Sequence, residues 1–228
     1  MNRFDINAVF LTLKIASIST ALTVIVAVFL VWSMEKRSKK LRSIIEMFIN
    51  LSLFISPTVL GYILIIFLGK RGIIGSYLYD FFNIQVIFSW WAGIITAFVV
   101  SLPLMYNCIK AGFSSLDYTY REAGKEMGAS DFQILRLIIL PLIRRNILAG
   151  IVLSFGRALG EFGATLMLAG NIPGKTQTMS IAIYSAVERG DDETANLLLV
   201  IVLIISFCIM CLYGAPQDDT SLTKKFET

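Results

Sequence analysis

The sequence predicts an all-α integral membrane protein with about five transmembrane helices, and three observations support this fold class. The 228 residues are 56% hydrophobic and only 16% charged, with a mean hydropathy of +0.74, whereas soluble domains are about a quarter charged. Several stretches reach the roughly 20 apolar residues that a helix needs to cross a bilayer. Most basic residues fall in alternate connections between these stretches. We therefore expect one transmembrane domain, 8–214, and a short cytoplasmic tail, 215–228.

The first predicted span covers about residues 8–32. It is too long for the apolar region of a signal peptide, and Arg3 is the only basic residue before it, so we expect it to remain in the membrane. The following segment, 35–42, carries five Lys or Arg residues among eight. Because strongly basic loops stay on the cytoplasmic side, this segment places the N-terminus outside.

Two further spans are predicted at about 44–68 and 88–109. The first contains Glu46 near its cytoplasmic end and Pro57 near its middle. Pro57 is expected to kink this span, since neighbouring helices can satisfy the carbonyl that a proline leaves free. The loop between the spans, 69–87, is rich in turn and aromatic residues and is predicted to be external.

A polar segment, 114–141, follows between the apolar spans, and its first part predicts a short amphipathic helix. Capping-box spacing occurs twice here, at Ser114 with Asp117 and at Thr119 with Glu122. This spacing predicts a helix that begins near Leu116. Residues three or four apart then form one apolar stripe, Leu116, Tyr120, Ala123 and Met127.

The second part of the segment predicts a break and a new helix. Gly128 can adopt the left-handed conformation that ends a helix. Ser130 and Gln133 form another capping-box pattern, which opens a strongly apolar helix. Pro141 removes a backbone donor and is expected to kink that helix.

The fourth predicted span, about 147–168, carries two charged residues deep within it, Arg157 and Glu161. A charge at the centre of a membrane helix costs roughly 2.5 to 3.5 kcal/mol on insertion scales, so such residues usually face a bundle interior or an aqueous path. The two are four residues apart and can pair. Two roles stay open, a buried ion pair that holds the bundle together and a direct role in translocation. Gly156 and Gly160 have the spacing of close helix packing.

The C-terminal part predicts a short amphipathic helix, 179–188, a solvated external acidic turn, 191–193, and a fifth span, about 195–214. The three cysteines lie in apolar spans and are interpreted as buried small hydrophobic residues, Cys108, Cys208 and Cys211. The chain has no histidine, which excludes histidine-liganded metal sites and histidine acid–base catalysis. We expect no metal site, no cofactor and no nucleic-acid partner.

The polar segment resembles the EAA motif of ABC-importer permeases. The residues that match at the motif's spacing are Glu122, Ala123, Gly128, Ile138, Leu140 and Pro141. Gly124 stands where the motif has a second alanine. In that family, the short helix docks into a groove on the ATP-hydrolysing subunit and transmits its motion to the membrane helices. The resemblance therefore implies a coupling role for Glu122, Ala123, Gly128, Leu140 and Pro141, with Arg121 and Lys125 as further contacts.

Longer stretches resemble the molybdate ABC-transporter permeases. They include Arg157-Ala-Leu-Gly-Glu-Phe-Gly-Ala-Thr-Leu-Met, Gly170-Asn-Ile-Pro-Gly-Lys-Thr-Gln-Thr and Leu102-Pro-Leu-Met. The resemblance covers about residues 8–213 and implies a type I importer permease in the cytoplasmic membrane of a prokaryote. It implies a homodimer, two ATP-binding subunits on the cytoplasmic side and an oxyanion-binding protein outside. For the translocation path we select Arg157, Glu161 and Thr165.

The residues alone leave other substrates and other protein classes to be considered. The chemistry of the side chains does not separate molybdate from tungstate, sulfate or thiosulfate. A secondary transporter would work without ATP, but the odd number of spans and the lack of an internal repeat argue against it. A membrane enzyme would need a nucleophile, an acid–base group or metal ligands, and the sequence has no corresponding motif. The chain is therefore predicted to be a transport subunit, with ATP hydrolysis on a partner.

Overall fold

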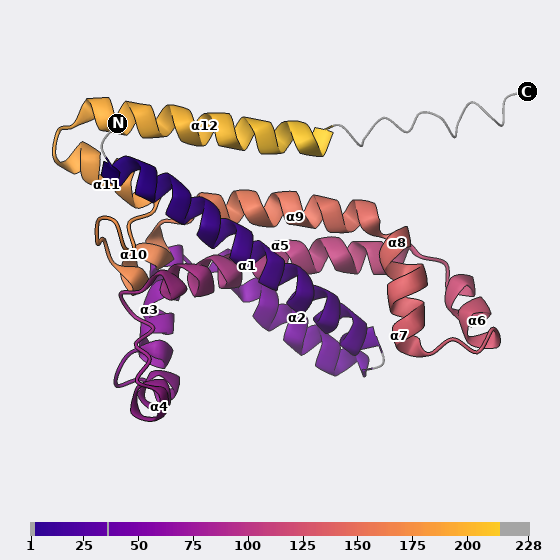
Figure 1. Cartoon of the computed structure of the whole chain (residues 1–228). Coiled ribbons are helices and arrows are strands. Elements are labelled where there is room, and N and C mark those ends of the chain that lie inside the picture. Colours follow the sequence, from indigo (N-terminus) through magenta and orange to yellow (C-terminus); the bar gives the residue numbers. More distant parts are fainter. Residues whose placement is uncertain (1–2, 36, 215–228) are drawn as a thin grey trace, which may run out of the picture.

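The computed structural model describes residues 3–35 and 37–214, which form helices joined by turns and short loops (Figure 1). The first half contains α1 (Arg3–Glu35), α2 (Lys39–Phe54), α3 (Pro57–Leu68), α4 (Ile73–Phe82) and α5 (Trp90–Ser115). The polar segment forms α6 (Thr119–Glu126), α7 (Asp131–Ile134), a π-helical turn (Leu135–Ile139) and α8 (Leu140–Leu142). The remaining helices are α9 (Arg144–Leu159), α10 (Gly163–Ala169), α11 (Met179–Glu188) and α12 (Asp192–Gly214). The predicted all-α fold class is confirmed.

Helices α1, α5 and α9 pack along one another and form the centre of the molecule (Figure 1). Met105, Tyr106 and Ile109 of α5 are fully buried together with Ile143, close to where the polar segment leaves the bundle. Gly150 of α9 allows a close approach to α5, because a Cβ there would lie only 2.6 Å from Sδ of Met105. This core provides the base from which the polar segment projects.

The close helix packing predicted at Gly156 and Gly160 does not occur within the described chain. A Cβ at Gly156 would meet nothing within 4 Å, and one at Gly160 would approach only the carbonyl oxygen of Gly156, at 3.8 Å. The surface of α9 that needs a glycine is the one that carries Gly150.

The predicted span 44–68 is two helices, not one. Helices α2 and α3 meet at a bend of 120°. Ser56 has extended backbone angles, φ −54° and ψ 136°, because a residue before proline disfavours the helical conformation. Pro57 then begins α3, where its missing donor costs nothing. The proline therefore breaks the span, a larger effect than the expected kink, and α3 turns away to pack on α10.

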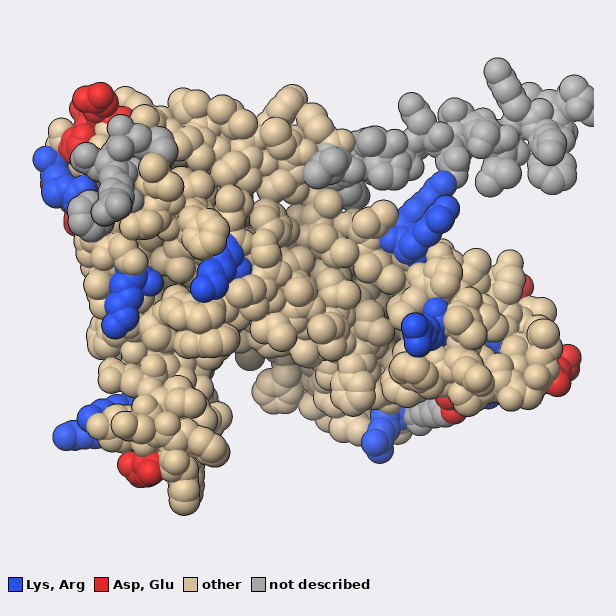
Figure 2. Space-filling model, viewed as in Figure 1, with Lys and Arg blue, Asp and Glu red and all other residues tan. Residues whose placement is uncertain are grey.

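The predicted external loop 69–87 contains a helix that the sequence reading missed, α4. The turn between α3 and α4 is tight, since a Cβ on Gly75 would lie 2.0 Å from the carbonyl oxygen of Gly69. Together α3 and α4 project from the body of the molecule at its lower left (Figures 1 and 2).

The predicted fourth span, 147–168, is also interrupted. Helix α9 ends at Leu159 and α10 begins at Gly163. At its other end, α9 makes an angle of 75° with the α7–α8 segment. Among the described residues, three helices are long and apolar enough to cross a membrane, Ile6–Glu35, Trp90–Ser115 and Asp192–Cys211. The number reaches five if α2 with α3, and α7–α8 with α9, each count as one bent span.

Two predictions for the C-terminal part need correction. The acidic run does not form a separate turn, because the Asp191 carboxylate accepts a hydrogen bond from the Thr194 N–H at 3.1 Å and Asp192 already begins α12. Cys208 and Cys211 are exposed on α12, which packs mainly on α11 and leaves its outer face uncovered. The predicted helix 179–188 is confirmed as α11.

Charged side chains gather toward the two ends of the molecule on the face shown in Figure 2, and the broad middle region carries almost none. One end holds α6 and α7, and the other holds α4 and the α11–α12 connection (Figure 1). An apolar belt between two charged ends is the pattern that a bilayer requires.

Candidate functional site

We call the polar segment 114–141 the coupling segment, after its predicted role; its first helix, α6, starts later than predicted. Leu116 has extended angles and ends α5, so it cannot open the next helix. Neither predicted capping box forms there. Instead, the Asp117 carboxylate accepts hydrogen bonds from the Thr119 hydroxyl at 2.6 Å and from its N–H at 3.0 Å. These bonds, led by that from the hydroxyl, hold the pKa of Asp117 below its ordinary value.

The end of α6 and the start of α7 follow the prediction. Gly128 has φ +77° and its N–H donates to the carbonyl of Lys125 at 2.9 Å, which ends the helix in the left-handed conformation. Ser130 accepts a hydrogen bond from the Gln133 N–H, and the Gln133 side chain accepts one from the Ser130 N–H. This capping box begins α7 at Asp131.

Gly124 is the residue of α6 that packs against the rest of the segment. It is buried, and a Cβ there would lie 3.0 Å from Cγ1 of Ile134 and 3.0 Å from Cδ1 of Ile138. The glycine that departs from the EAA pattern therefore allows a close contact between α6 and the helical segment behind it. Glu122 and Ala123, its neighbours in the motif, are exposed.

A face of α6 next to Gly124 carries apolar side chains that the described chain leaves uncovered. The side chains of the predicted stripe at Tyr120, Ala123 and Met127 are exposed, Met127 to 87% and Tyr120 to 51%. Tyr118, before α6, and Phe132, on α7, are exposed as well. We call the exposed apolar side chains of Tyr118, Tyr120, Ala123, Met127 and Phe132 the outer face of the coupling segment. Lys125 is exposed as well.

Arg121 points toward the membrane helices. Its guanidinium pairs with the carboxylate of Glu35 at the end of α1 and lies 5.6 Å from the ring centre of Phe113. The pair borders a pocket of about 180 Å³ between α1, α6 and the segment after it. Arg121 thus ties α6 to α1, and its predicted contact with an ATPase stays a prediction.

The segment after α7 returns the chain to the bundle through a π-helical turn. Leu140 donates its N–H to the carbonyl of Leu135, five residues earlier. The wider turn directly precedes Pro141, which is exposed, whereas Leu140 is half-buried against the core. The chain bends at Ile143 before α9 begins, so the predicted kink lies just after the proline.

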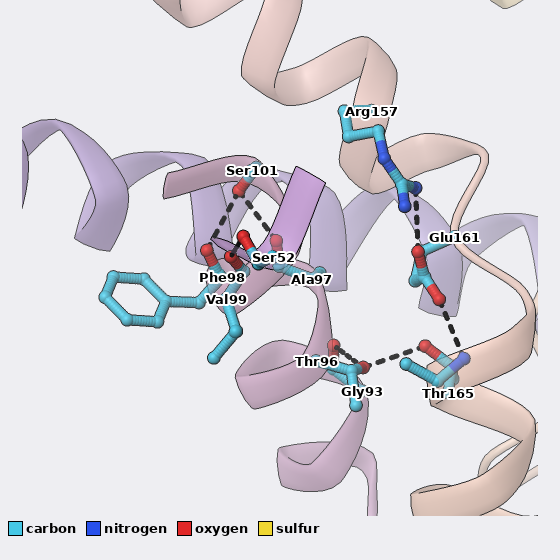
Figure 3. A network of polar contacts seen from close by, with 11 residues as sticks. Ser52, Gly93, Thr96, Ala97, Phe98, Val99, Ser101, Arg157, Glu161 and Thr165 are labelled. Carbon is cyan, nitrogen blue, oxygen red and sulfur yellow. Dashed lines mark hydrogen bonds and ion pairs between the residues drawn. The ribbon is translucent and has the colours of Figure 1, made fainter. Parts of the chain in front are cut away.

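The residues selected for the translocation path lie at the junction of α9 and α10 (Figure 3). Glu161 is buried, with 3% of its surface exposed. One of its carboxylate oxygens lies 2.7 Å from Nη1 of Arg157, and the other accepts from the Ala164 N–H at 2.9 Å. Thr165 is 2.8 Å from the hydroxyl of Thr96 on α5.

These contacts give partners within the chain to both carboxylate oxygens of Glu161 and to the Thr165 hydroxyl. Glu161 caps α10 and pairs with Arg157, whose side chain remains 31% exposed. The geometry matches the first of the two roles that the sequence left open, an ion pair that holds helices together. The second role, in translocation, stays a prediction.

A polar cluster that was not predicted from the sequence lies between α2 and α5. The Glu46 carboxylate contacts Nε of Arg42 at 2.9 Å, Nζ of Lys110 at 2.8 Å and the hydroxyl of Tyr106 at 3.1 Å. The sequence does contain a pattern that indicates this cluster. Three polar residues lie four apart on α2, Arg42, Glu46 and Asn50, so they share one face of the helix.

The chain matches known proteins over nearly its whole length. Residues 19–217 match the family described as binding-protein-dependent transport system inner membrane component. A putative molybdenum transport system permease protein of Bacillus subtilis is 39% identical over 202 residues, 89% of each chain. The molybdenum transport system permease protein of Haemophilus influenzae is 35% identical over 88% of each chain. Probable sulfate transport system permeases are less similar, at 28% identity.

A solved structure agrees with the fold. A chain of a bacterial ABC transporter involved in the import of alginate superimposes with a TM-score of 0.74, covering 100% of this chain and 82% of that one at 17% sequence identity. At this identity, the likeness shows the fold of a type I importer permease. The family match covers most of the sequence, and the chain therefore belongs to the binding-protein-dependent transport system inner membrane components, the permease subunits of ABC importers.

Proposed function

We propose that this permease imports molybdate. The supporting observation is the 35% and 39% identity, over almost nine-tenths of each chain, to relatives described as molybdenum transport permeases. In the same proposal, the chain acts as a homodimer with two ATP-binding subunits on its cytoplasmic side and an oxyanion-binding protein outside. It lies in the cytoplasmic membrane of a prokaryote, with its N-terminus outside and its C-terminus in the cytoplasm.

The observation that carries the coupling mechanism is the outer face of the coupling segment. Tyr118, Tyr120 and Met127 expose apolar surface at a charged end of the molecule, where water would otherwise meet it. An apolar helix face beside Glu122 and Lys125 is suited to insertion into a groove on a partner protein. The adjoining side of α6 contacts the rest of the chain through Gly124 and the Arg121–Glu35 pair. A force on the outer face therefore reaches α1 and the segment leading to α9.

Exposed apolar helices support the homodimer. Helix α2 has no buried residue, and Phe54 at its end is 86% exposed. Phe81 and Phe82 on the projecting α4 are also exposed. Because the polar cluster at Glu46 lies on α2 as well, lipid alone would leave charged groups facing hydrocarbon. A second copy against α2 encloses an aqueous path there.

The mechanism is alternating access. Binding of ATP brings the two ATP-binding subunits together, and the coupling segments move with them. The dimer then opens outward to receive the anion from the binding protein, and hydrolysis returns it to the inward-open state.

The test is the ATPase activity of the purified complex in nanodiscs with its binding protein. Molybdate, tungstate, sulfate and thiosulfate are added in turn. Stimulation by molybdate but not by sulfate or thiosulfate supports the proposal, and loss of the stimulation in Glu122→Ala supports the coupling role. Stimulation by sulfate alone would indicate that the substrate is sulfate and not molybdate. Uptake that persists with a hydrolysis-deficient ATPase would instead indicate a secondary transporter.

A further inference from the structure

A row of polar side chains lies between α2 and α5. We call it the polar seam and define it by Arg42, Glu46, Asn50, Ser52, Tyr106, Asn107 and Lys110. Beyond the three contacts of the Glu46 carboxylate, the Asn107 amide donates to Asn50 at 2.8 Å, and the Ser52 hydroxyl donates to the Val99 carbonyl at 3.3 Å.

The polarity of the seam changes in order along the helices. The charged groups lie near the start of α2 and the end of α5, the amides of Asn50 and Asn107 come next, and Ser52 follows toward the end of α2. The charged end is the one that leads to the coupling segment, which we assign to the cytoplasmic side. Polar side chains within membrane helices are costly and are retained where they pair or face an aqueous path. A row of such side chains, with charged groups followed by amides and a hydroxyl, therefore indicates a path for the anion rather than a single structural contact.

The seam is open on one side. The side chains of Arg42 and Lys110 are 35% and 33% exposed. A pocket of about 350 Å³ adjoins the seam at Glu46 and Asn50, and Ser43, Met47, Leu51 and Phe54 complete its lining. Arg42 and Lys110 lie next to it through the Glu46 carboxylate that both of them contact. The pocket volume is many times the roughly 30 Å³ that one water occupies in the liquid, so a small hydrated anion can enter.

The charges of the seam suit a passing oxyanion. A guanidinium and an ammonium are the side chains that bind such anions with charge-assisted hydrogen bonds. Two cations without a counter-ion would hold a dianion tightly and slow its release. The Glu46 carboxylate already pairs with both cations, so an entering anion must compete with this intramolecular carboxylate.

We propose that the polar seam is the cytoplasmic exit of the anion path, in which Arg42 and Lys110 contact the oxyanion and Glu46 displaces it. This inference rests on the proposed function for its substrate, a tetrahedral oxyanion. It places the exit apart from Arg157, Glu161 and Thr165, where the Glu161 carboxylate and the Thr165 hydroxyl have partners within the chain.

The test measures the local potential and its response to the anion. Ser43 is exposed in the pocket lining and is changed to cysteine after Cys108, Cys208 and Cys211 are replaced by serine. The complex in nanodiscs is treated with a sulfonate-bearing or an ammonium-bearing methanethiosulfonate. The ratio of the two modification rates reports the potential at Ser43 and cancels differences in exposure between variants.

We expect the ratio of anionic to cationic reagent to fall several-fold in Arg42→Gln and Lys110→Gln, to rise several-fold in Glu46→Gln, and to stay near wild type in Lys110→Arg. Molybdate should slow the anionic reagent, at lower concentration in Glu46→Gln. Arg136→Gln is the control, since Arg136 is an exposed cation outside the seam, and should leave the ratio unchanged.

A second measurement addresses release. Proteoliposomes preloaded with molybdate should show stronger inhibition of uptake in Glu46→Gln than in wild type, because the anion is retained at the exit. A purely structural pair would lower thermal stability in this variant without changing the inhibition. Unchanged reagent ratios, or no effect of any oxyanion on modification, would overturn the exit. If sulfate protects Ser43→Cys but molybdate does not, the proposed substrate fails and the exit stands.

Discussion

The coupling segment and the α9–α10 junction both carry charged residues that the sequence marks as functional, yet the two regions use them in opposite ways. At the junction, Glu161 is buried and its carboxylate is bonded to Arg157 and to the Ala164 N–H. On α6, Glu122 is exposed next to an apolar face that nothing in the described chain covers. Removing one partner of a buried charged group destabilises the fold, whereas an exposed apolar surface indicates a missing partner.

The largest effect is expected from Glu161→Ala. The change leaves Arg157 without its counter-ion and the start of α10 without its cap. Breaking a fully buried ion pair typically costs about 3–5 kcal/mol. Because Arg157 is 31% exposed, we expect a loss of about 3 kcal/mol or less, seen as a lower unfolding temperature in detergent. Glu122→Ala is the matched control and should change stability by less than about 0.5 kcal/mol. A stable Glu161→Ala protein that has lost only transport would instead favour the direct translocation role.

The next effect is expected from Met127→Asp. Met127 is 87% exposed, so a carboxylate there is solvated in the free chain and stability should not change. In the complex it would be buried against an apolar groove without a partner. We expect the ATP-binding subunit to bind at least about tenfold more weakly, which corresponds to about 1.4 kcal/mol, measured with the permease in nanodiscs. Met127→Leu is the control, and equal binding by the Asp variant would place the interface elsewhere.

A smaller effect separates two roles of Arg121. If its ion pair with Glu35 positions α6, then Arg121→Glu and Glu35→Arg should each lower uptake per ATP hydrolysed, and the double exchange should restore it. A partly exposed pair contributes up to about 1 kcal/mol, so the single changes should weaken coupling without unfolding the chain. Failure of the double exchange to restore coupling would indicate that Arg121 contacts the ATPase directly.

Local sequence rules predicted the parts of the site that depend on nearby residues. The left-handed Gly128 and the Ser130–Gln133 capping box form as expected, because each involves the backbone of only a few residues. The predicted start of α6 failed because α5 continues to Ser115, and its length is set by packing against α1 and α9.

The breaks in the membrane helices depended on information outside the local pattern. Pro57 marked the right place, but the 120° bend also requires α10 as a surface on which α3 can pack. The end of α9 at Leu159 carries no proline, and the Glu161 contacts that stabilise the junction bring in the Ala164 N–H from the next helix. The polar seam was missed for the same reason, since Glu46 and Lys110 meet only in the fold.

The smallest effect on coupling is expected at Gly124, because helix propensity and packing act there in opposite directions. Gly124→Ala introduces the alanine of the EAA pattern and gains about 1 kcal/mol of helix propensity. The new Cβ, however, lies 3.0 Å from Ile134 and Ile138, and overpacking typically costs about 1–3 kcal/mol. We expect a net loss of less than about 2 kcal/mol by this difference, seen as faster hydrogen exchange in α6 and slightly weaker coupling. Ile138→Val removes the crowding Cδ1 atom and should recover part of the loss when combined with Gly124→Ala. If Gly124→Ala instead slows hydrogen exchange in α6, the Ile138 side chain has moved to make room for the new Cβ. The close approach at Gly124 would then not be what holds α6 in place.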